Sequence, residues 1–137
     1  MITMTMQTEI SPADIKVLDD GIVQYNIEKC GLTWQPLYLL LRDEQGQLVG
    51  GLTGQTEWGW LYVKLLWLSE ALRQHGWGSR LLQAAEDEAR KRGCKYVHLD
   101  SFGFQAPGFY QKHGYEVFGI LEHYPPGYNR YYLKKTL

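Results

Sequence analysis

The spacing of apolar residues predicts a helix near the start of the chain. Apolar side chains recur every three or four residues between Ser11 and Gly31, which is typical of one face of a helix. Ser11 followed by Pro12 is a characteristic helix start, and Gly31 is a characteristic stop. The residues on this face are Ile15, Leu18, Ile22 and Tyr25. Gly21 could divide the helix in two, and the loose alternation of Met1–Ile10 predicts a short edge strand.

After Gln35 the pattern changes to the short apolar runs of β-strands. The expected strands are Leu37–Arg42, Leu48–Thr53, Trp60–Leu68, Tyr96–Ser101, Tyr115–Ile120 and Tyr131–Lys135. The third run, WLYVKLLWL, is apolar almost throughout, which predicts a central strand covered on both faces. Two more helices are expected, over Gly76–Arg92 and about Ala106–His113. This order predicts an α/β domain over residues 1–137, with a mixed sheet and helices on both faces.

The second expected helix is strongly amphipathic. Its apolar stripe consists of Leu81, Leu82, Ala85 and Ala89. Acidic residues precede basic ones by four positions in the pairs Glu86–Arg90, Asp87–Lys91 and Glu88–Arg92. Such pairs are typical of an outer helix surface, so we expect all three there.

Composition and charge narrow the range of partners. The chain has 137 residues and a net charge of −1, which gives no support for electrostatic binding to nucleic acid or an anionic membrane. Cys30 and Cys94 are far apart and in no metal-binding spacing, so we expect two free thiols and no metal site. The first ten residues, MITMTMQTEI, have neither the basic start nor the long apolar run of a signal peptide, and no stretch is apolar enough to span a membrane. A cytoplasmic protein is expected.

The most informative stretch is LRQHGWGSRLL, from Leu72 to Leu82, where a strand gives way to a helix. The first N–H groups of a helix have no internal partners, and glycines let an anion approach them closely. Arg73 would add a cation and Ser79 a hydroxyl. A pyrophosphate site is therefore favoured over a plain tight turn, which two glycines alone would also suit. The sequence fits neither the mononucleotide P-loop nor the dinucleotide fingerprint, because the required lysine and the third glycine are missing.

These residues give the chain a resemblance to the GNAT superfamily of N-acetyltransferases. Its Arg/Gln-x-x-Gly-x-Gly/Ala pattern is similar to Arg73–Gly78, and its strand ending Leu-x-Val is similar to Leu66–Leu68. Further on, Ala106, Tyr110 and Gly114-Tyr115 match the family's Ala, Tyr and Gly-Phe positions. The resemblance runs from about residue 35 to the end of the chain. It implies a single GNAT-like domain whose mostly antiparallel sheet has one parallel pair, splayed at the cofactor site.

The resemblance also implies where acetyl-CoA would bind. Its pyrophosphate would lie on the backbone N–H groups of the glycine loop, and its pantetheine arm would pair with the strand end before it. The implied cofactor-binding residues are Leu66, Leu68, Arg73, Gln74, His75, Gly76, Trp77, Gly78 and Ser79. Many relatives carry Asn three residues before the conserved Ala; Gly103 stands there in this chain.

By the same resemblance, Tyr110 is the general acid that would protonate the departing thiolate, although its spacing alone would also suit a core aromatic residue. For the general base we name Glu57 first, because several relatives place a carboxylate just before this strand. The other candidates are His98, Asp100, Glu122 and His123. Trp58, Trp60, Tyr124 and Tyr128 could surround a cationic or flat amine, or could fill a dimer interface.

The leading hypothesis is an acetyl-CoA-dependent N-acetyltransferase that acts on a primary amine of a small molecule and forms a homodimer. Two alternatives stay open at this point. One is a module that binds or senses acyl-CoA without catalysis, motivated by Gly103 and the uncertain base. The other is an enzyme that acetylates a protein N-terminus or a lysine.

Overall fold

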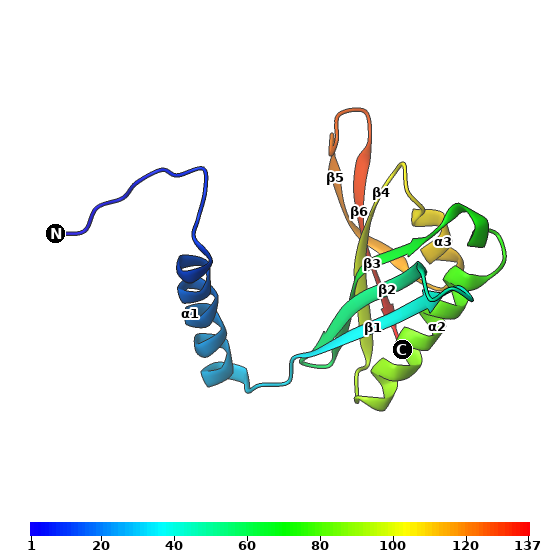
Figure 1. The fold of residues 1–137 in the computed structure, drawn as a ribbon, viewed down its shortest axis with the longest axis horizontal. Coiled ribbons are helices and arrows are strands. Elements are labelled where there is room, and N and C mark those ends of the chain that lie inside the picture. Colours follow the sequence, from blue (N-terminus) through cyan, green and yellow to red (C-terminus); the bar gives the residue numbers. More distant parts are fainter. The chain divides into compact units, whose positions relative to one another are not determined.

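The computed structural model describes all residues from Met1 to Leu137, and they form two units, Met1–Leu32 and Thr33–Leu137. The first unit contains the helix α1, Pro12–Cys30 (Figure 1). Its predicted caps are confirmed, since the Ser11 side chain accepts a hydrogen bond from the Asp14 N–H at 3.0 Å and Gly31 ends the helix at φ 80°. The edge strand predicted for residues 1–10 is wrong, because no other segment pairs with them.

Helix α1 runs through Gly21 without a break, so the possible division into two helices is also wrong. A glycine inside a helix costs only about 1 kcal/mol relative to alanine, which eighteen other helical residues tolerate. Ile15, Leu18, Ile22 and Tyr25, the apolar residues predicted to share one face, all lie in α1, which is the only helix of the first unit. None of the helices combines the length and apolarity that a membrane crossing requires.

The second unit is built on a six-stranded sheet in the order β1-β2-β3-β4-β6-β5. The strands are β1 Gln35–Arg42, β2 Leu48–Glu57, β3 Trp60–Leu68, β4 Tyr96–Phe102, β5 Glu116–Glu122 and β6 Asn129–Thr136. Only β3 and β4 run parallel, while every other neighbouring pair is antiparallel. The predicted mixed α/β sheet with one parallel pair is confirmed. The sheet has six strands and lacks only the edge strand that was predicted for residues 1–10.

Two helices and a short 3₁₀ turn complete this unit: α2 Trp77–Lys91, α3 Pro107–Lys112 and η1 Glu70–Leu72. Figure 1 shows α2 and α3 on the same side of the sheet. The predicted stripe of α2 is buried there, in a core with leucine and valine side chains of the central strands. Both cysteines are free, as predicted. A helical cover on the opposite face of the sheet stays a prediction.

The parallel pair is splayed, as the family resemblance implied. β3 and β4 are paired only from Trp60 to Tyr62, opposite Tyr96 to His98. The later part of β3 has no neighbouring strand on that side, so its backbone edge faces an open space between the two strands. The prediction that both faces of β3 are covered stays a prediction for its second half, like the helical cover of the opposite face.

Another correction concerns Glu86, which is buried at 1% exposure and not on the outer surface of α2. Tyr115 donates its hydroxyl proton to Glu86 Oε2 at 2.8 Å, and Lys135 Nζ donates to Oε1 at 2.7 Å. Burial and the adjacent Glu86 carboxylate raise the pKa of Tyr115 far above its usual range, so it stays a donor. The buried charge is tolerated because Lys135 pairs with it, and the pair joins α2 to β6.

Gly54 of β2 lies opposite a bulge of β3, where Lys64 has no partner on β2, at the start of the splay. The register between β2 and β3 shifts between Thr53 and Gly54, and a Cβ atom on Gly54 would lie 2.2 Å from the Tyr62 carbonyl oxygen. Since that oxygen belongs to the backbone, we expect Gly54→Ala to lower the free energy of unfolding by about 1–3 kcal/mol. Urea unfolding measures this. The control is Gly21→Ala, because Gly21 has nothing within 4 Å and lies in a helix, where alanine is favoured. Equal urea midpoints for the two variants would show that the close approach of Tyr62 to Gly54 does not matter for stability.

Candidate active site

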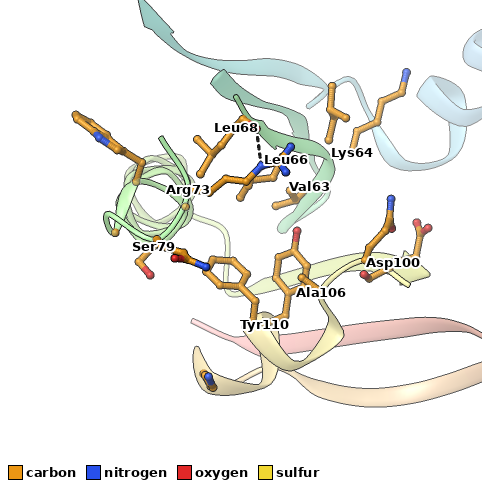
Figure 2. Close-up of a pocket in the computed structure, with 18 residues that line it drawn as sticks. Val63, Lys64, Leu66, Leu68, Arg73, Ser79, Asp100, Ala106 and Tyr110 are labelled. Atoms are coloured by element: carbon orange, nitrogen blue, oxygen red, sulfur yellow. Dashed lines mark hydrogen bonds between the residues drawn. The ribbon is translucent and has the colours of Figure 1, made fainter. Parts of the chain in front are cut away.

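A cavity of about 760 Å³ occupies the splay between β3 and β4 (Figure 2). Its walls come from the second half of β3, the loop and first turn of α2, the end of β4, and α3. Elements distant in the sequence thus meet at one opening. Most of the cofactor-binding residues expected from the sequence line it: Leu66, Leu68, Arg73, Gln74, Gly76, Trp77, Gly78 and Ser79. His75 is the exception.

The N-terminus of α2 opens into this cavity. The first intrahelical hydrogen bond runs from the Arg80 N–H to the Gly76 carbonyl at 3.1 Å. The N–H groups of Trp77, Gly78 and Ser79 therefore have no acceptor within the helix. Together with the positive end of the helix dipole, they form a place where phosphate oxygens can bind.

The two glycines of the loop serve different structural needs. Gly76 adopts φ 82°, a left-handed conformation that side chains rarely allow, and a Cβ atom there would meet nothing within 4 Å. At Gly78 a Cβ atom would lie 3.3 Å from Cζ of Phe109, so this glycine lets α3 pack closely on α2. The sequence analysis favoured one reason for both, the approach of a ligand, over a tight turn.

The loop cation Arg73 is anchored to the strand end. Its Nε donates a hydrogen bond to the Leu68 carbonyl at 3.1 Å, marked by the dashed line in Figure 2. The side chain lines the cavity and so places positive charge beside the N-terminus of α2. Trp77 also lines the cavity, and the Arg80 guanidinium lies 4.1 Å from its ring centroid.

The hydroxyl of Ser79 is engaged from α3. Ser79 Oγ lies 2.9 Å from Nε2 of His113, and the His113 ring is 4.8 Å from the ring of Phe109. This contact joins the start of α2 to the end of α3. The sequence analysis missed His113, because nothing in the local pattern shows that residues 34 positions apart would meet.

The free side of β3 fits an extended ligand. Leu66 and Leu68 lie beyond the last rung shared with β4, so their backbone faces the cavity and not a neighbouring strand. An extended chain with amide groups can pair with such an edge as an added strand does. These residues, with the α2 terminus, fit the pantetheine and pyrophosphate parts of coenzyme A.

Tyr110 projects from α3 into the cavity toward β3, with Val63 and Leu66 opposite (Figure 2). Burial raises the pKa of its hydroxyl, and the negative charge of Asp100 raises it further. The group is therefore protonated at neutral pH and can donate a proton. Its ring also packs against Phe109 and Tyr115, with centroids 5.1 Å and 5.9 Å away. Both interpretations of Tyr110 therefore apply: its ring packs against other aromatic side chains, and its hydroxyl lies in the cavity.

Asp100 is the carboxylate that the structure brings to this cavity. It lies at the end of β4 and accepts a hydrogen bond from Arg130 Nε at 2.8 Å, with a second guanidinium nitrogen 2.6 Å away. The hydrogen bond that Arg130 donates to Asp100 raises the pKa of Arg130. Arg130 on β6 thus fixes the direction of the carboxylate.

Glu57, the base named first from the sequence, is not brought into this cavity. It pairs with Trp60 next to the β2–β3 turn, three residues before Val63, where the cavity begins, a separation of about 10 Å along the strand. It lines a smaller pocket with Trp58, Trp60, Tyr62 and His98. Glu122 and His123 lie at the end of β5 and just beyond it, and they do not line the cavity either.

The two aromatic walls predicted for the acceptor lie at opposite ends of β4. Trp58 and Trp60 belong to the small pocket beside the start of β4. Tyr124 and Tyr128 instead gather near its end, where Tyr124 stacks on Phe102 at 5.5 Å and Tyr128 meets Phe104 edge-on at 5.2 Å. The sequence analysis did not name Phe102, the last residue of β4, or Phe104, two residues later, among the expected aromatic walls.

Gly103 stands where many relatives of the resembled family carry Asn. Its N–H donates to the Asn129 carbonyl at 2.8 Å, and a Cβ atom would lie 3.4 Å from that oxygen. The position therefore ties the end of β4 to the start of β6. It offers no side chain to the cavity.

Comparison with known proteins agrees with this geometry. Residues 5–115 match the acetyltransferase (GNAT) family. The chain is 45% identical to blasticidin-S acetyltransferase of Streptomyces morookaense over 95 residues, which cover 69% of this chain and 70% of that protein. It is 36% identical to the acetyltransferase Atu2258 of Agrobacterium fabrum over 121 residues, 88% of each chain. The crystal structure of an acetyltransferase from Bacillus cereus superimposes with a TM-score of 0.83 at 32% identity, covering 97% of this chain and 98% of that one.

Proposed function

Since this chain belongs to the acetyltransferase (GNAT) family, we propose that it transfers the acetyl group of acetyl-CoA to a primary amine of a small molecule. The observation that carries the proposal is a single cavity shared by the α2 N-terminus, the free edge of β3 and Tyr110. The similarity to blasticidin-S acetyltransferase supports a small-molecule acceptor, because that protein's name identifies one.

In this proposal the donor is held by backbone groups. The N–H groups at the start of α2 bind the pyrophosphate, and Arg73 adds a positive charge beside them. The edge of β3 around Leu66 and Leu68 binds the pantetheine arm, and an N–H near Leu68 polarises the carbonyl to be attacked. Acetyl-CoA supplies an activated acetyl thioester in this position.

In this proposal, side chains of the cavity donate and accept the protons of the reaction. The amine nitrogen forms a bond to the acetyl carbon while the carbon–sulfur bond breaks, so the amine must lose a proton and the sulfur must gain one. Tyr110 holds a donatable proton because its pKa is raised. In place of Glu57, we assign to Asp100 the role of facing the amine and accepting its proton, since Asp100 lines the same cavity as Tyr110.

The Gly76→Glu variant tests donor binding. We expect acetyl-CoA to stabilise the wild-type protein by about 2.7 kcal/mol at a hundredfold excess over its dissociation constant. Gly76→Glu should abolish this increment, because it adds a carboxylate where phosphate oxygens would lie and strains a residue at φ 82°. Thermal unfolding with and without acetyl-CoA measures both effects.

Gly46→Glu is the matched control for that variant. Gly46 has φ 79° and nothing within 4 Å, but it lies in the β1–β2 turn and does not line the cavity. It should lose a similar amount of intrinsic stability and keep the increment from acetyl-CoA. A wild-type protein that does not respond to acetyl-CoA, or a Gly76→Glu protein that responds fully, would refute the donor site.

A further inference from the structure

The smaller pocket beside the β2–β3 turn has no part in the chemistry described above. It measures about 220 Å³ and is lined by Gln55 and Glu57 of β2, Trp58 of the turn, Trp60 and Tyr62 of β3, and His98 of β4. The Tyr62 and His98 rings are stacked at 4.8 Å, and Trp60 meets His98 edge-on at 5.6 Å. The walls are thus mainly the faces and edges of aromatic rings held by three strands.

The only charged residue that lines this pocket is Glu57. Glu57 takes part in no ion pair or side-chain hydrogen bond of the structure. Burial lowers the pKa of His98, more than Asp100 raises it, so the imidazole is neutral at neutral pH. A carboxylate among electron-rich rings favours a positively charged organic group.

The pocket and the main cavity are close neighbours. Tyr62 and His98 form the last rung between β3 and β4, and the cavity begins at the next residue, Val63. His98 of the pocket and Asp100 of the cavity project from the same face of β4, about 7 Å apart along the strand. One small molecule can therefore reach both places.

We propose that this pocket is a subsite for an organic cation, and that it holds a second ammonium or guanidinium group of the acceptor while the reacting amine lies at Asp100. The inference rests on the proposed acetyltransferase function and adds the class of acceptor: a small molecule with two cationic groups a few bonds apart. Glu57 then acts in acceptor recognition through its charge, and the rings of Trp58, Trp60 and Tyr62 act through cation–π contacts.

The first test compares a diamine with a monoamine of the same length. For cadaverine, Glu57→Gln should raise KM about tenfold, the effect of losing one charge-assisted hydrogen bond, with kcat little changed. The KM values for pentylamine and for acetyl-CoA should stay as in the wild type. Glu44→Gln, an equal change of charge in the exposed β1–β2 turn, should alter none of these values. An unchanged KM for cadaverine in Glu57→Gln would overturn the proposal.

The second test measures binding without turnover. Tetramethylammonium, which cannot be acetylated, should shift the indole N–H signals of Trp58 and Trp60 in NMR spectra of the wild type and of Glu44→Gln, and much less in Glu57→Gln. If these signals do not move, or move equally in all three proteins, the subsite is wrong even if acetyl transfer occurs. If they move as expected and no amine is acetylated, the subsite stands as a cation site and the proposed function fails.

Discussion

Replacing Tyr110 with Phe is expected to lower kcat for acetyl transfer by a factor of about 10²–10⁴, the usual contribution of a positioned general acid. The phenylalanine ring would keep the contacts with Phe109 and Tyr115 and lose only the hydroxyl that faces β3 in the cavity. The departing sulfur would then lack its proton donor. The dissociation constant of acetyl-CoA should stay nearly the same, because the proposal assigns its binding to backbone groups of α2 and β3. Steady-state kinetics and a ligand-dependent thermal shift measure the two quantities.

The matched control is Tyr38→Phe, which removes a hydroxyl from an exposed tyrosine on β1 and should leave kcat unchanged. The pH profile adds a second check. Since the pKa of Tyr110 is raised, wild-type activity should not fall through loss of this proton at any pH up to about 10, the ordinary tyrosine value. A Tyr110→Phe enzyme with wild-type kcat would remove Tyr110 from the role of acid.

Replacing Lys135 with Met is expected to lower the free energy of unfolding by about 3–5 kcal/mol, because it leaves a buried carboxylate without its cation. Lys135 Nζ lies 2.7 Å from Glu86 Oε1, and the only other basic group near that oxygen is Arg90, at 3.9 Å. The Tyr115 hydroxyl would remain as a hydrogen-bond donor to Glu86 without supplying charge. Urea unfolding monitored by circular dichroism measures the loss.

The control for this variant lies one residue earlier. Lys134 pairs with Glu116 at 3.9 Å on the exposed edge of the sheet, where such pairs contribute about 1 kcal/mol or less. Lys134→Met should therefore change stability little. The double variant Glu86→Leu/Lys135→Met should recover much of the loss, because it removes both buried charges together. Equal destabilisation by Lys134→Met and Lys135→Met would mean that Glu86 does not depend on Lys135.

The sequence predicted the elements of the fold well where the signal was local. Ser11 and Gly31 mark the ends of α1, and the run WLYVKLLWL became the central strand β3, because caps and apolar runs act over a few residues. Local patterns failed where a long-range contact decides the outcome. The i,i+4 spacing of Glu86 and Arg90 is typical of a surface pair. Glu86 is nevertheless buried, because Lys135 of β6 and Tyr115, just before β5, donate hydrogen bonds to its carboxylate.

In the candidate site, too, local motifs could be predicted from the sequence and long-range contacts could not. The glycine loop and Tyr110 could be found by motif, and both line one cavity. Glu57 could not be placed, because its distance from the cavity depends on where β3 and β4 part, after Tyr62 and His98, and no local pattern shows this long-range pairing. The carboxylate of Asp100 is oriented by a hydrogen bond from Arg130, thirty residues later. No periodicity in the chain encodes that pairing.

The most direct test of the account is a turnover assay with the wild-type protein, acetyl-CoA and a panel of small amines that includes blasticidin S, cadaverine and an aminoglycoside. Release of free thiol is followed with time, and mass spectrometry identifies the acetylated amine. The account predicts that thiol release depends on the amine and is matched by an equal amount of acetylated product. Stabilisation by acetyl-CoA with no turnover of any amine would contradict it, and would favour a protein that binds acyl-CoA without catalysis.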